Sequence, residues 1–265
     1  MRALQALAGA VIAAVAATCG IGGGLFAVPI LHYLFRVPLQ VSVATALCLV
    51  WCVATAATVS EALHPAGALF PVVVVALVAG SLVGAQIGFA VAIRLKTRAL
   101  KVVFCVALFA VGAKIVAMSG GAAPPPDAGY RPDLVGGVTV VGIGLLAGIL
   151  VPLLGVGGGL IVVPGLLLLV PDVGFLGARA ASLGTAVVSA SRSLWLYHGR
   201  GLVDWRMGSW FGLGGALGAV VGVQLVHRRG AAEIGQVLLG VVLLFAAARF
   251  GWDVVKGRAE PEGGP

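Results

Sequence analysis

The sequence predicts an all-α polytopic membrane protein built from two homologous repeats of inverted topology. Of its 265 residues, 60% are hydrophobic and only 10% are charged, whereas soluble domains average about 45–50% apolar and about 25% charged residues. Its 41 glycines are spread along the apolar segments, and one glycine-rich motif occurs twice. This composition excludes a soluble enzyme, a nucleic-acid-binding protein and a disulfide-stapled secreted module.

The repeats are marked by CGIGGGLFAVP from Cys19 to Pro29 and LGVGGGLIVVP from Leu154 to Pro164. Further positions match in the same order: Ser42 with Ser182, Thr45 with Thr185, His64 with His198, and Gly80, Gly84 and Gly88 with Gly214, Gly218 and Gly222. Ordered matches over a whole half indicate duplication. We therefore divide the chain into a first repeat (1–119), an extramembrane linker (120–133), a second repeat (134–252) and a cytoplasmic tail (253–265).

Each repeat contains a glycine-broken segment followed by three uninterrupted apolar stretches. A membrane helix needs about 20 apolar residues to cross about 30 Å of hydrocarbon. We expect six full spans, at 41–62, 68–93, 99–118, 180–197, 203–226 and 233–252.

The glycine-broken segments, 4–35 and 134–170, are too long for one straight span and too short for two. The parts after the glycines, 25–35 and 160–170, would reach only about 16 Å at about 1.5 Å per residue. We expect hairpins that enter the membrane and return to the same side. One long, kinked and tilted helix in each repeat is the alternative.

The positive charges distinguish these two arrangements. With hairpins, the second repeat is inverted, and eleven Lys and Arg residues fall on one side against five, Arg179 among them, on the other. With single crossings, the same residues divide eight to eight. Because cytoplasmic loops carry the Lys and Arg excess, we favour inverted repeats in the cytoplasmic membrane with both termini inside. The net charge of +8 then records topology and indicates no nucleic-acid partner.

The duplicated motif is the strongest candidate for function. A glycine cluster that breaks a helix leaves backbone N–H groups without intrahelical partners, and the helix that restarts there directs the positive end of its dipole inward. Such broken helices form anion sites in inverted-repeat transporters. The predicted donors are the amides of Gly22, Gly23, Gly24, Gly157, Gly158 and Gly159, with Gly20, Pro29, Gly155 and Pro164 as structural motif residues. Close helix packing through small residues is the alternative interpretation.

Other polar residues could complete the site. Helix-borne hydroxyls that could bind an oxyanion are Ser42, Thr45, Ser182 and Thr185, although each could instead bond its own helix. Arg192 lies within a predicted span, so it could attract an anion, snorkel or form a structural pair. Proton relay by Glu61, His64 and His198 is a further hypothesis beside an ordinary interfacial role. No polar constellation suggests catalysis, so we expect no catalytic residues and no cofactor. We also expect no metal site, because Cys48 and Cys52 have no counterpart in the second repeat.

With two GxGGGxxxxP segments, each followed by a small polar helix start and a Gly-xxx-Gly helix, the sequence resembles the sulfite exporter TauE/SafE family of bacterial permeases. The resemblance extends from about Leu4 to Phe250. It implies outward transport of small sulfur-containing or organic anions, such as sulfite and sulfonates. It supports only the motif positions and says nothing specific about Arg192.

The sequence thus predicts a transporter that moves a small anion by alternating access at a midplane site between the two broken helices. Its expected partners are the anion and the lipid bilayer, and a homodimer is left open. An anion channel is the alternative within transport. An intramembrane hydrolase or transferase using Ser191 or His198 is the alternative from another class.

Overall fold

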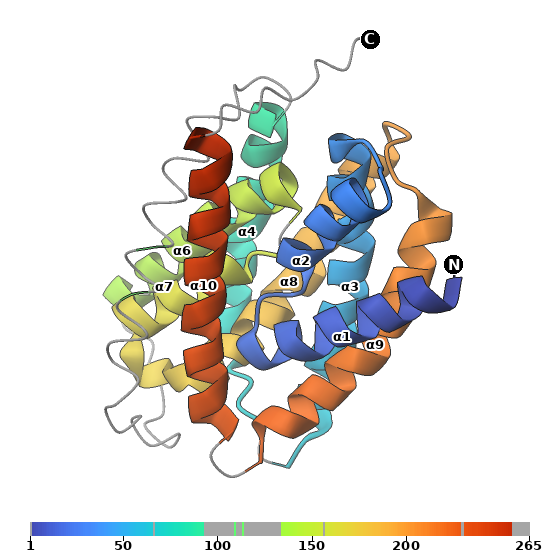
Figure 1. Ribbon diagram of the computed structural model, residues 1–265. Coiled ribbons are helices and arrows are strands. Elements are labelled where there is room, and N and C mark those ends of the chain that lie inside the picture. Colours follow the sequence, from blue (N-terminus) through green and yellow to red (C-terminus); the bar gives the residue numbers. More distant parts are fainter. Residues whose placement is uncertain are drawn as a thin grey trace.

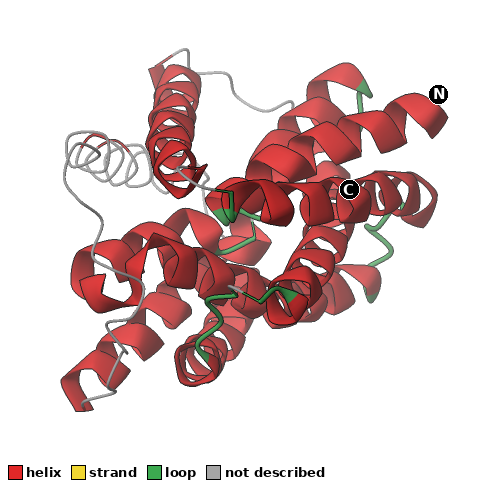
Figure 2. Ribbon diagram, turned by 90° about the horizontal axis from the view of Figure 1, so that it is seen from below, coloured by secondary structure: helices red, strands yellow, loops and turns green. Residues whose placement is uncertain are grey.

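The computed structural model describes residues 2–65, 67–92, 109, 113, 134–155, 157–228 and 231–255. Every element in this part of the chain is helical (Figure 2). The helices are α1 (Arg2–Cys19), α2 (Gly24–Pro29), α3 (Leu39–Leu63), α4 (Pro71–Ala92), α6 (Leu134–Leu154), α7 (Gly159–Leu169), α8 (Gly174–His198), α9 (Trp205–Val226) and α10 (Ala231–Val255). A π-helical turn (Ile30–Leu34) continues α2, and a 3₁₀ turn (Pro171–Val173) precedes α8.

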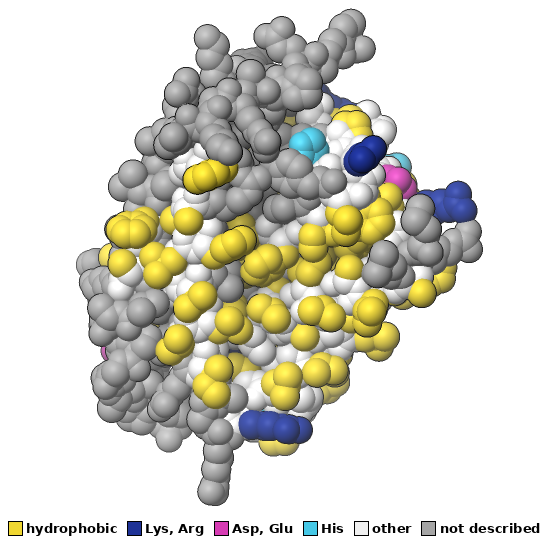
Figure 3. All heavy atoms as spheres, in the orientation of Figure 1, with side chains coloured by type: hydrophobic (Ala, Val, Ile, Leu, Met, Phe, Trp, Pro, Cys, Tyr) yellow, Lys and Arg dark blue, Asp and Glu magenta, His cyan; other side chains and the backbone are white. Residues whose placement is uncertain are grey.

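Five stretches of the described chain are long and apolar enough to cross a membrane: Gln40–Leu63, Pro71–Val91, Gly136–Leu153, Pro171–His198 and Trp205–Val226. Four of them coincide with predicted spans. The predicted span at 233–252 forms α10, which is not among the five, and the span at 99–118 lies outside the described residues apart from two positions. On the face shown in Figure 3, hydrophobic side chains cover the middle and the Lys and Arg side chains lie toward the edges, as expected for a lipid-facing belt.

The glycine-broken segments form two helices each. The helical part after each break is eleven residues long, since α2 and its π-helical turn cover 24–34 and α7 covers 159–169. These bounds agree with the short arms expected at 25–35 and 160–170. The α-helix ends at Pro29 in the first repeat, whereas α7 continues through Pro164.

Side-chain contacts give the relative directions of the long helices. α3 and α9 run parallel, because Cβ atoms on Gly208 and Gly212 would lie against Cys48 and Cys52 in that order. α3 and α8 run antiparallel, because Arg179 near the start of α8 contacts Glu61 near the end of α3. α4 and α8 run parallel, since Phe70, just before α4, lies close to Gly177 near the start of α8, and Phe89 and Tyr197 form an edge-to-face pair near the ends of both helices.

Two glycine stripes bring α4 against α6 and α9 against α1; in Figure 1, α1 and α9 cross the lower part of the molecule side by side. On α4, Cβ atoms on Gly80, Gly84 and Gly88 would meet the carbonyl oxygens of Val141, Leu145 and Ile149 at 2.1–2.2 Å. On α9, Cβ atoms on Gly214, Gly218 and Gly222 would meet the carbonyl oxygens of Ala6, Ala10 and Ala14 at 1.9–2.5 Å. Only glycine permits backbones this close, and both pairs run parallel.

Candidate functional site

The two glycine breaks meet inside the protein. A Cβ atom on Gly159 would lie 2.1 Å from the carbonyl oxygen of Gly20, and one on Gly22 would lie 3.6 Å from the Cα of Gly157. All four glycines are buried. The motifs that the sequence places in separate halves therefore form one junction.

The backbone at the first break requires glycine. Gly20, Gly22 and Gly23 have φ angles of 77°, 77° and 84°, and Gly155 at the second break has a φ of 65°. L-residues with side chains rarely adopt this left-handed region. The glycines thus reverse the chain between α1 and α2 and between α6 and α7, in addition to allowing close packing.

Some backbone amides at each break have no acceptor in the described part of the chain. Within the described residues, no hydrogen-bond acceptor pairs with the amides of Gly22, Gly23 or Gly24 at the first break, or with those of Gly157 and Gly158 at the second. The Gly159 amide bonds the Gly157 carbonyl. Buried N–H groups usually have a partner, and the helix starts add a positive partial charge. This junction can therefore accept an anion or ordered water.

Of the four predicted hydroxyls, Ser182 is the one seen to bond a break, since its Oγ donates to the Gly20 carbonyl at 2.7 Å. The Thr185 hydroxyl donates to the Ala181 carbonyl of its own helix at 2.8 Å. Ser42 donates to the Val37 carbonyl at 3.1 Å, and Thr45 accepts from the Asp204 amide at 3.2 Å. Thr45 thus lies at the end of α3 opposite to Glu61.

A buried ion pair lies beside the first break. Arg179 and Glu61 are both fully buried and form a salt bridge, and Arg179 Nη1 also donates to the Ala17 carbonyl at 3.1 Å. A Cβ atom on Gly20 would lie 2.9 Å from Arg179 Cγ. The sequence analysis puts Arg179 just outside the predicted span at 180–197, whereas α8 begins at Gly174 and carries this residue inside the helix.

Two histidines extend this pair. His227 Nε2 lies 3.0 Å from Glu61 Oε1, and its ring stacks on that of His64 with centroids 4.1 Å apart. The Ala68 amide donates to the same carboxylate oxygen at 3.1 Å. Burial lowers the pKa of His227 below its ordinary value, partly offset by the Glu61 charge. We call Glu61, Arg179, His227 and His64 the polar cluster.

Two other predicted residues lie away from the junction. The guanidinium of Arg192 stacks over the ring of Trp195 at 5.1 Å, and Trp195 is exposed. His198 is exposed and accepts a hydrogen bond from Trp205 Nε1 at 3.2 Å. The structure therefore brings neither residue to the glycine breaks.

The serines of the hydrolase alternative bond their own helix. The Ser191 hydroxyl donates to the Val187 carbonyl at 2.6 Å, and Ser189 donates to the Thr185 carbonyl at 3.0 Å. Neither hydrogen bond involves His198.

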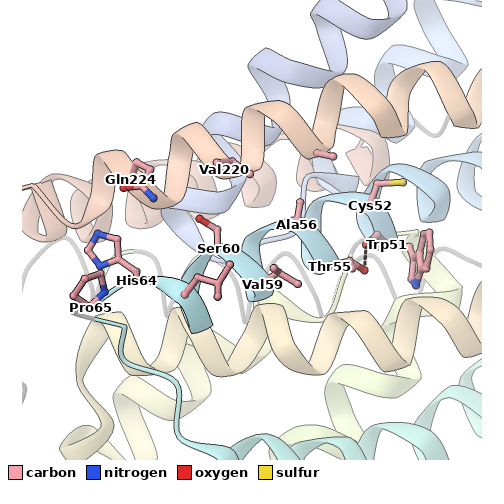
Figure 4. Close-up of a pocket in the computed structure, with 12 residues that line it drawn as sticks. Trp51, Cys52, Thr55, Ala56, Val59, Ser60, His64, Pro65, Val220 and Gln224 are labelled. Carbon is pink, nitrogen blue, oxygen red and sulfur yellow. Dashed lines mark hydrogen bonds between the residues drawn. The ribbon is translucent and has the colours of Figure 1, made fainter.

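An open groove lies between α3 and α9 (Figure 4). Its lining is mainly apolar and includes Trp51, Val59 and Val220, while His64 and Gln224 lie near each other at one end. The groove is separate from the glycine junction, but it reaches the polar cluster through His64.

Sequence reasoning missed Arg179 and His227 as parts of a site. One signal was present for Arg179, because Pro171 favours a helix start and an earlier start of α8 would have put the arginine within the membrane. A second signal was Glu61, since an acidic residue near a membrane span generally needs a partner. No signal in the sequence pointed to His227.

A family model described as "Sulfite exporter TauE/SafE" matches residues 1–115 and 140–264 of the chain. Neither a search of curated proteins nor a search of solved structures finds a match. The matched ranges contain both glycine motifs and all members of the polar cluster. With its apolar spans, the chain therefore belongs to the sulfite exporter TauE/SafE family of multi-pass membrane transporters.

Proposed function

We propose that this chain exports small sulfur-containing or organic anions, such as sulfite and sulfonates, by alternating access around the junction of the two glycine breaks. In this proposal the amides of Gly22–Gly24, Gly157 and Gly158 bind the oxyanion, whereas the Gly159 amide bonds the Gly157 carbonyl, and Ser182 positions the first break. The protein works in the cytoplasmic membrane, with both termini inside the cell.

The single observation that carries the proposal is the meeting of two helix starts whose buried amides have no acceptor among the described residues. One helix start with free N–H groups is common, but two at one junction could both donate to the same small ligand. An anion satisfies these donors and interacts favourably with both helix dipoles. An apolar or cationic substrate would do neither.

The helix directions support hairpins at the two breaks. Because α6 runs parallel to α4, it starts at the membrane face where α4 starts, and α8 starts at that face too. The segment containing α6 and α7 would then enter and leave at one face, as a hairpin does. The antiparallel course of α3 and α8 agrees with an inverted second repeat, whereas single crossings would make these helices parallel.

The glycine stripes support the repeat architecture. In the first repeat, α4 packs on α6, the first helix of the second repeat. In the second repeat, α9 packs in the same way on α1, the first helix of the first repeat. Equivalent contacts made in both directions are expected of a pseudo-symmetric pair. Such a pair could expose its central site to either side by rocking one half against the other.

The driving force follows from the substrate charge. A negative-inside membrane potential expels anions with about 2.3 kcal/mol per charge per 100 mV. A carrier with a neutral binding site would use this force directly. Coupling to protons is the other option, and the polar cluster provides groups for it.

Proteoliposomes containing the full chain test the function. We expect uptake of sulfite or methanesulfonate that is stimulated by the same anion trapped on the opposite side, because a carrier returns faster when loaded. Flux without this counterflow would indicate a channel instead. The variant Gly23→Leu should insert but not transport, and normal transport would exclude the amide site.

Topology can be tested by cysteine labelling. Arg200→Cys and Arg228→Cys should react with impermeant reagents from opposite faces of the membrane, with position 200 inside. Labelling of both from one face would contradict the inverted arrangement. Unsubstituted protein controls for the native cysteines, among which Cys19 and Cys48 are buried.

A further inference from the structure

We propose that Arg179 is the cationic half of the anion site. Before an anion binds, the Glu61 carboxylate pairs with Arg179, and when a proton neutralises this carboxylate an oxyanion takes its place on the arginine. This inference rests on the proposed function. It adds a charged ligand-binding residue and a proton-coupling device to the backbone site at the junction.

Position supports the role of Arg179. Its side-chain stem lies against Gly20 at the first break, and Ser182, one turn further along α8, donates to the carbonyl of the same glycine. The arginine and the free amides of the break therefore belong to one local structure. From this stem the guanidinium reaches the Ala17 carbonyl and Glu61, so binding of an anion at the break would draw it away from Glu61.

The hydrogen bonds of Arg179 leave one of its three nitrogen atoms without a partner among the described residues. Nη2 bonds Glu61 and Nη1 bonds the Ala17 carbonyl, whereas Nε is buried and has no partner among the described residues. Nε is two bonds from Cγ, the atom closest to Gly20. A guanidinium binds a carboxylate or another oxyanion best through two parallel donors, so this arrangement leaves room for a better acceptor.

Charge balance supplies the reason for a proton. The Arg179–Glu61 pair is neutral as a whole, and a buried site that gained one anion without compensation would carry an unpaired charge at high cost. If Glu61 takes up one proton when a monoanion binds, the site stays neutral. One proton is therefore bound for each monoanion, and no bond other than that O–H is formed.

The histidines provide a route for this proton. His64 lines the open groove between α3 and α9 (Figure 4), stacks on His227, and His227 Nε2 faces Glu61 Oε1. Among the described residues, the groups that face Glu61 are Arg179 from α8, His227 from the end of α9, and the Ala68 amide. Cys19 at the end of α1 is a further titratable group near Arg179.

The energetic consequence is distinct from that of a simple anion carrier. Movement of an anion together with a proton carries no net charge, so transport would respond to the pH gradient rather than to the membrane potential. In a cell with an alkaline interior, export by this route would be driven by a higher anion concentration inside. Anion affinity and protonation of Glu61 must also strengthen each other by equal factors. Binding therefore tightens as pH falls.

Methanesulfonate binding to the purified full-length protein in detergent tests the proposal, because a sulfonate stays a monoanion between pH 5 and 8. We expect its Kd to fall by up to about tenfold per pH unit on acidification, the limit for one coupled proton. Glu61→Gln, which mimics the protonated acid, should bind with the low-pH affinity of the unsubstituted protein at every pH. Arg179→Gln should weaken binding by about 30-fold or more.

Arg228→Gln is the matched control, since Arg228 is an exposed cation next to His227, and it should keep both the affinity and its pH dependence. If Arg179→Gln does not remain monodisperse, the double variant Glu61→Gln/Arg179→Gln removes both charges and should likewise lose binding. Unchanged pH dependence in Glu61→Gln, or normal binding by the double variant, would overturn the inference. Counterflow of the unsubstituted protein would still support the proposed function in that case, whereas its absence would contradict the function itself.

Discussion

The two glycine breaks have similar backbones but different surroundings. The first break packs against a buried ion pair, through the contact of Gly20 with Arg179. At the second break, the equivalent glycine, Gly155, approaches Val28 and Val43. Gly157, which is also in the second break, approaches Val50. Duplication thus preserved the glycine pattern, which fixes the chain path, while the electrostatic environment came to differ.

This difference divides the work between the breaks. Backbone amides at both breaks offer partial positive charge, but the described residues place full charges at the first break alone. In a symmetric pair the two half-sites would bind an anion equally. Here we expect the first break to control the affinity for the anion and the pH dependence of binding. The second break should contribute its backbone amides and its packing against the first.

The largest effect should come from breaking the ion pair. Glu61→Ala leaves the Arg179 guanidinium buried without its counter-charge, which typically costs about 3–5 kcal/mol of unfolding free energy. The double variant Glu61→Leu/Arg179→Met gives the first break an apolar environment like that of the second, and should recover most of this loss. Thermal unfolding in detergent, followed by circular dichroism, measures both. A double variant as unstable as Glu61→Ala would show that the first break needs its charges to fold.

The next effect should come from the contact between the breaks. Gly159→Ala places a Cβ atom where it would lie 2.1 Å from the Gly20 carbonyl oxygen, so the breaks must separate at an overpacking cost of about 1–3 kcal/mol. Gly142→Ala in α6 is the control, because a Cβ atom there would meet nothing within 4 Å. Gly159→Ala should therefore unfold at a lower temperature and take up less methanesulfonate than Gly142→Ala. Equal behaviour would mean that the breaks need not touch.

The sequence predicted the parts of this site that depend on local chemistry. Gly22 and Gly157 were found because glycine clusters in apolar segments break helices wherever they occur, and the short arms after them followed from length alone. The partner of Glu61 could not be found in this way. Its contact with Arg179 joins the end of α3 to the start of α8, and such a pairing depends on tertiary packing that periodicity does not encode.

The same reasoning explains why the sequence drew attention to Arg192 rather than to Arg179. In the sequence, an arginine in the middle of an apolar stretch is more conspicuous than one near its edge. In the structure, the edge residue Arg179 points into the protein and the central residue stacks on exposed Trp195. Which face of α8 is buried is decided by the helices around it, and the hydrophobic pattern of α8 is too uniform to reveal that face.

A smaller effect should separate the two equivalent serines. Ser182→Ala removes the bond to the Gly20 carbonyl and leaves a buried acceptor unsatisfied, at a cost of about 1–2 kcal/mol. Ser42→Ala should cost about 0.5 kcal/mol, because the Val37 carbonyl keeps His32 Nδ1 as a donor at 2.9 Å. Chemical or thermal unfolding of both variants gives the comparison. Equal losses would indicate that Ser182 has no special relation to the first break.

The smallest effect concerns pH and again distinguishes the breaks. Because burial lowers the pKa of His227 below 6.5, the unfolded chain binds a proton there before the folded protein does. This contribution to stability is therefore fully present above about pH 6.5 and is lost as pH falls toward the lowered pKa. We expect the unfolding temperature in the absence of anion to decrease between pH 7 and pH 5.5, and His227→Gln to reduce that decrease. The described residues place no titratable side chain against the glycines of the second break. If the decrease in unfolding temperature persists unchanged in His227→Gln, a pH-sensitive group elsewhere must cause it. That outcome would weaken the division of roles between the two breaks.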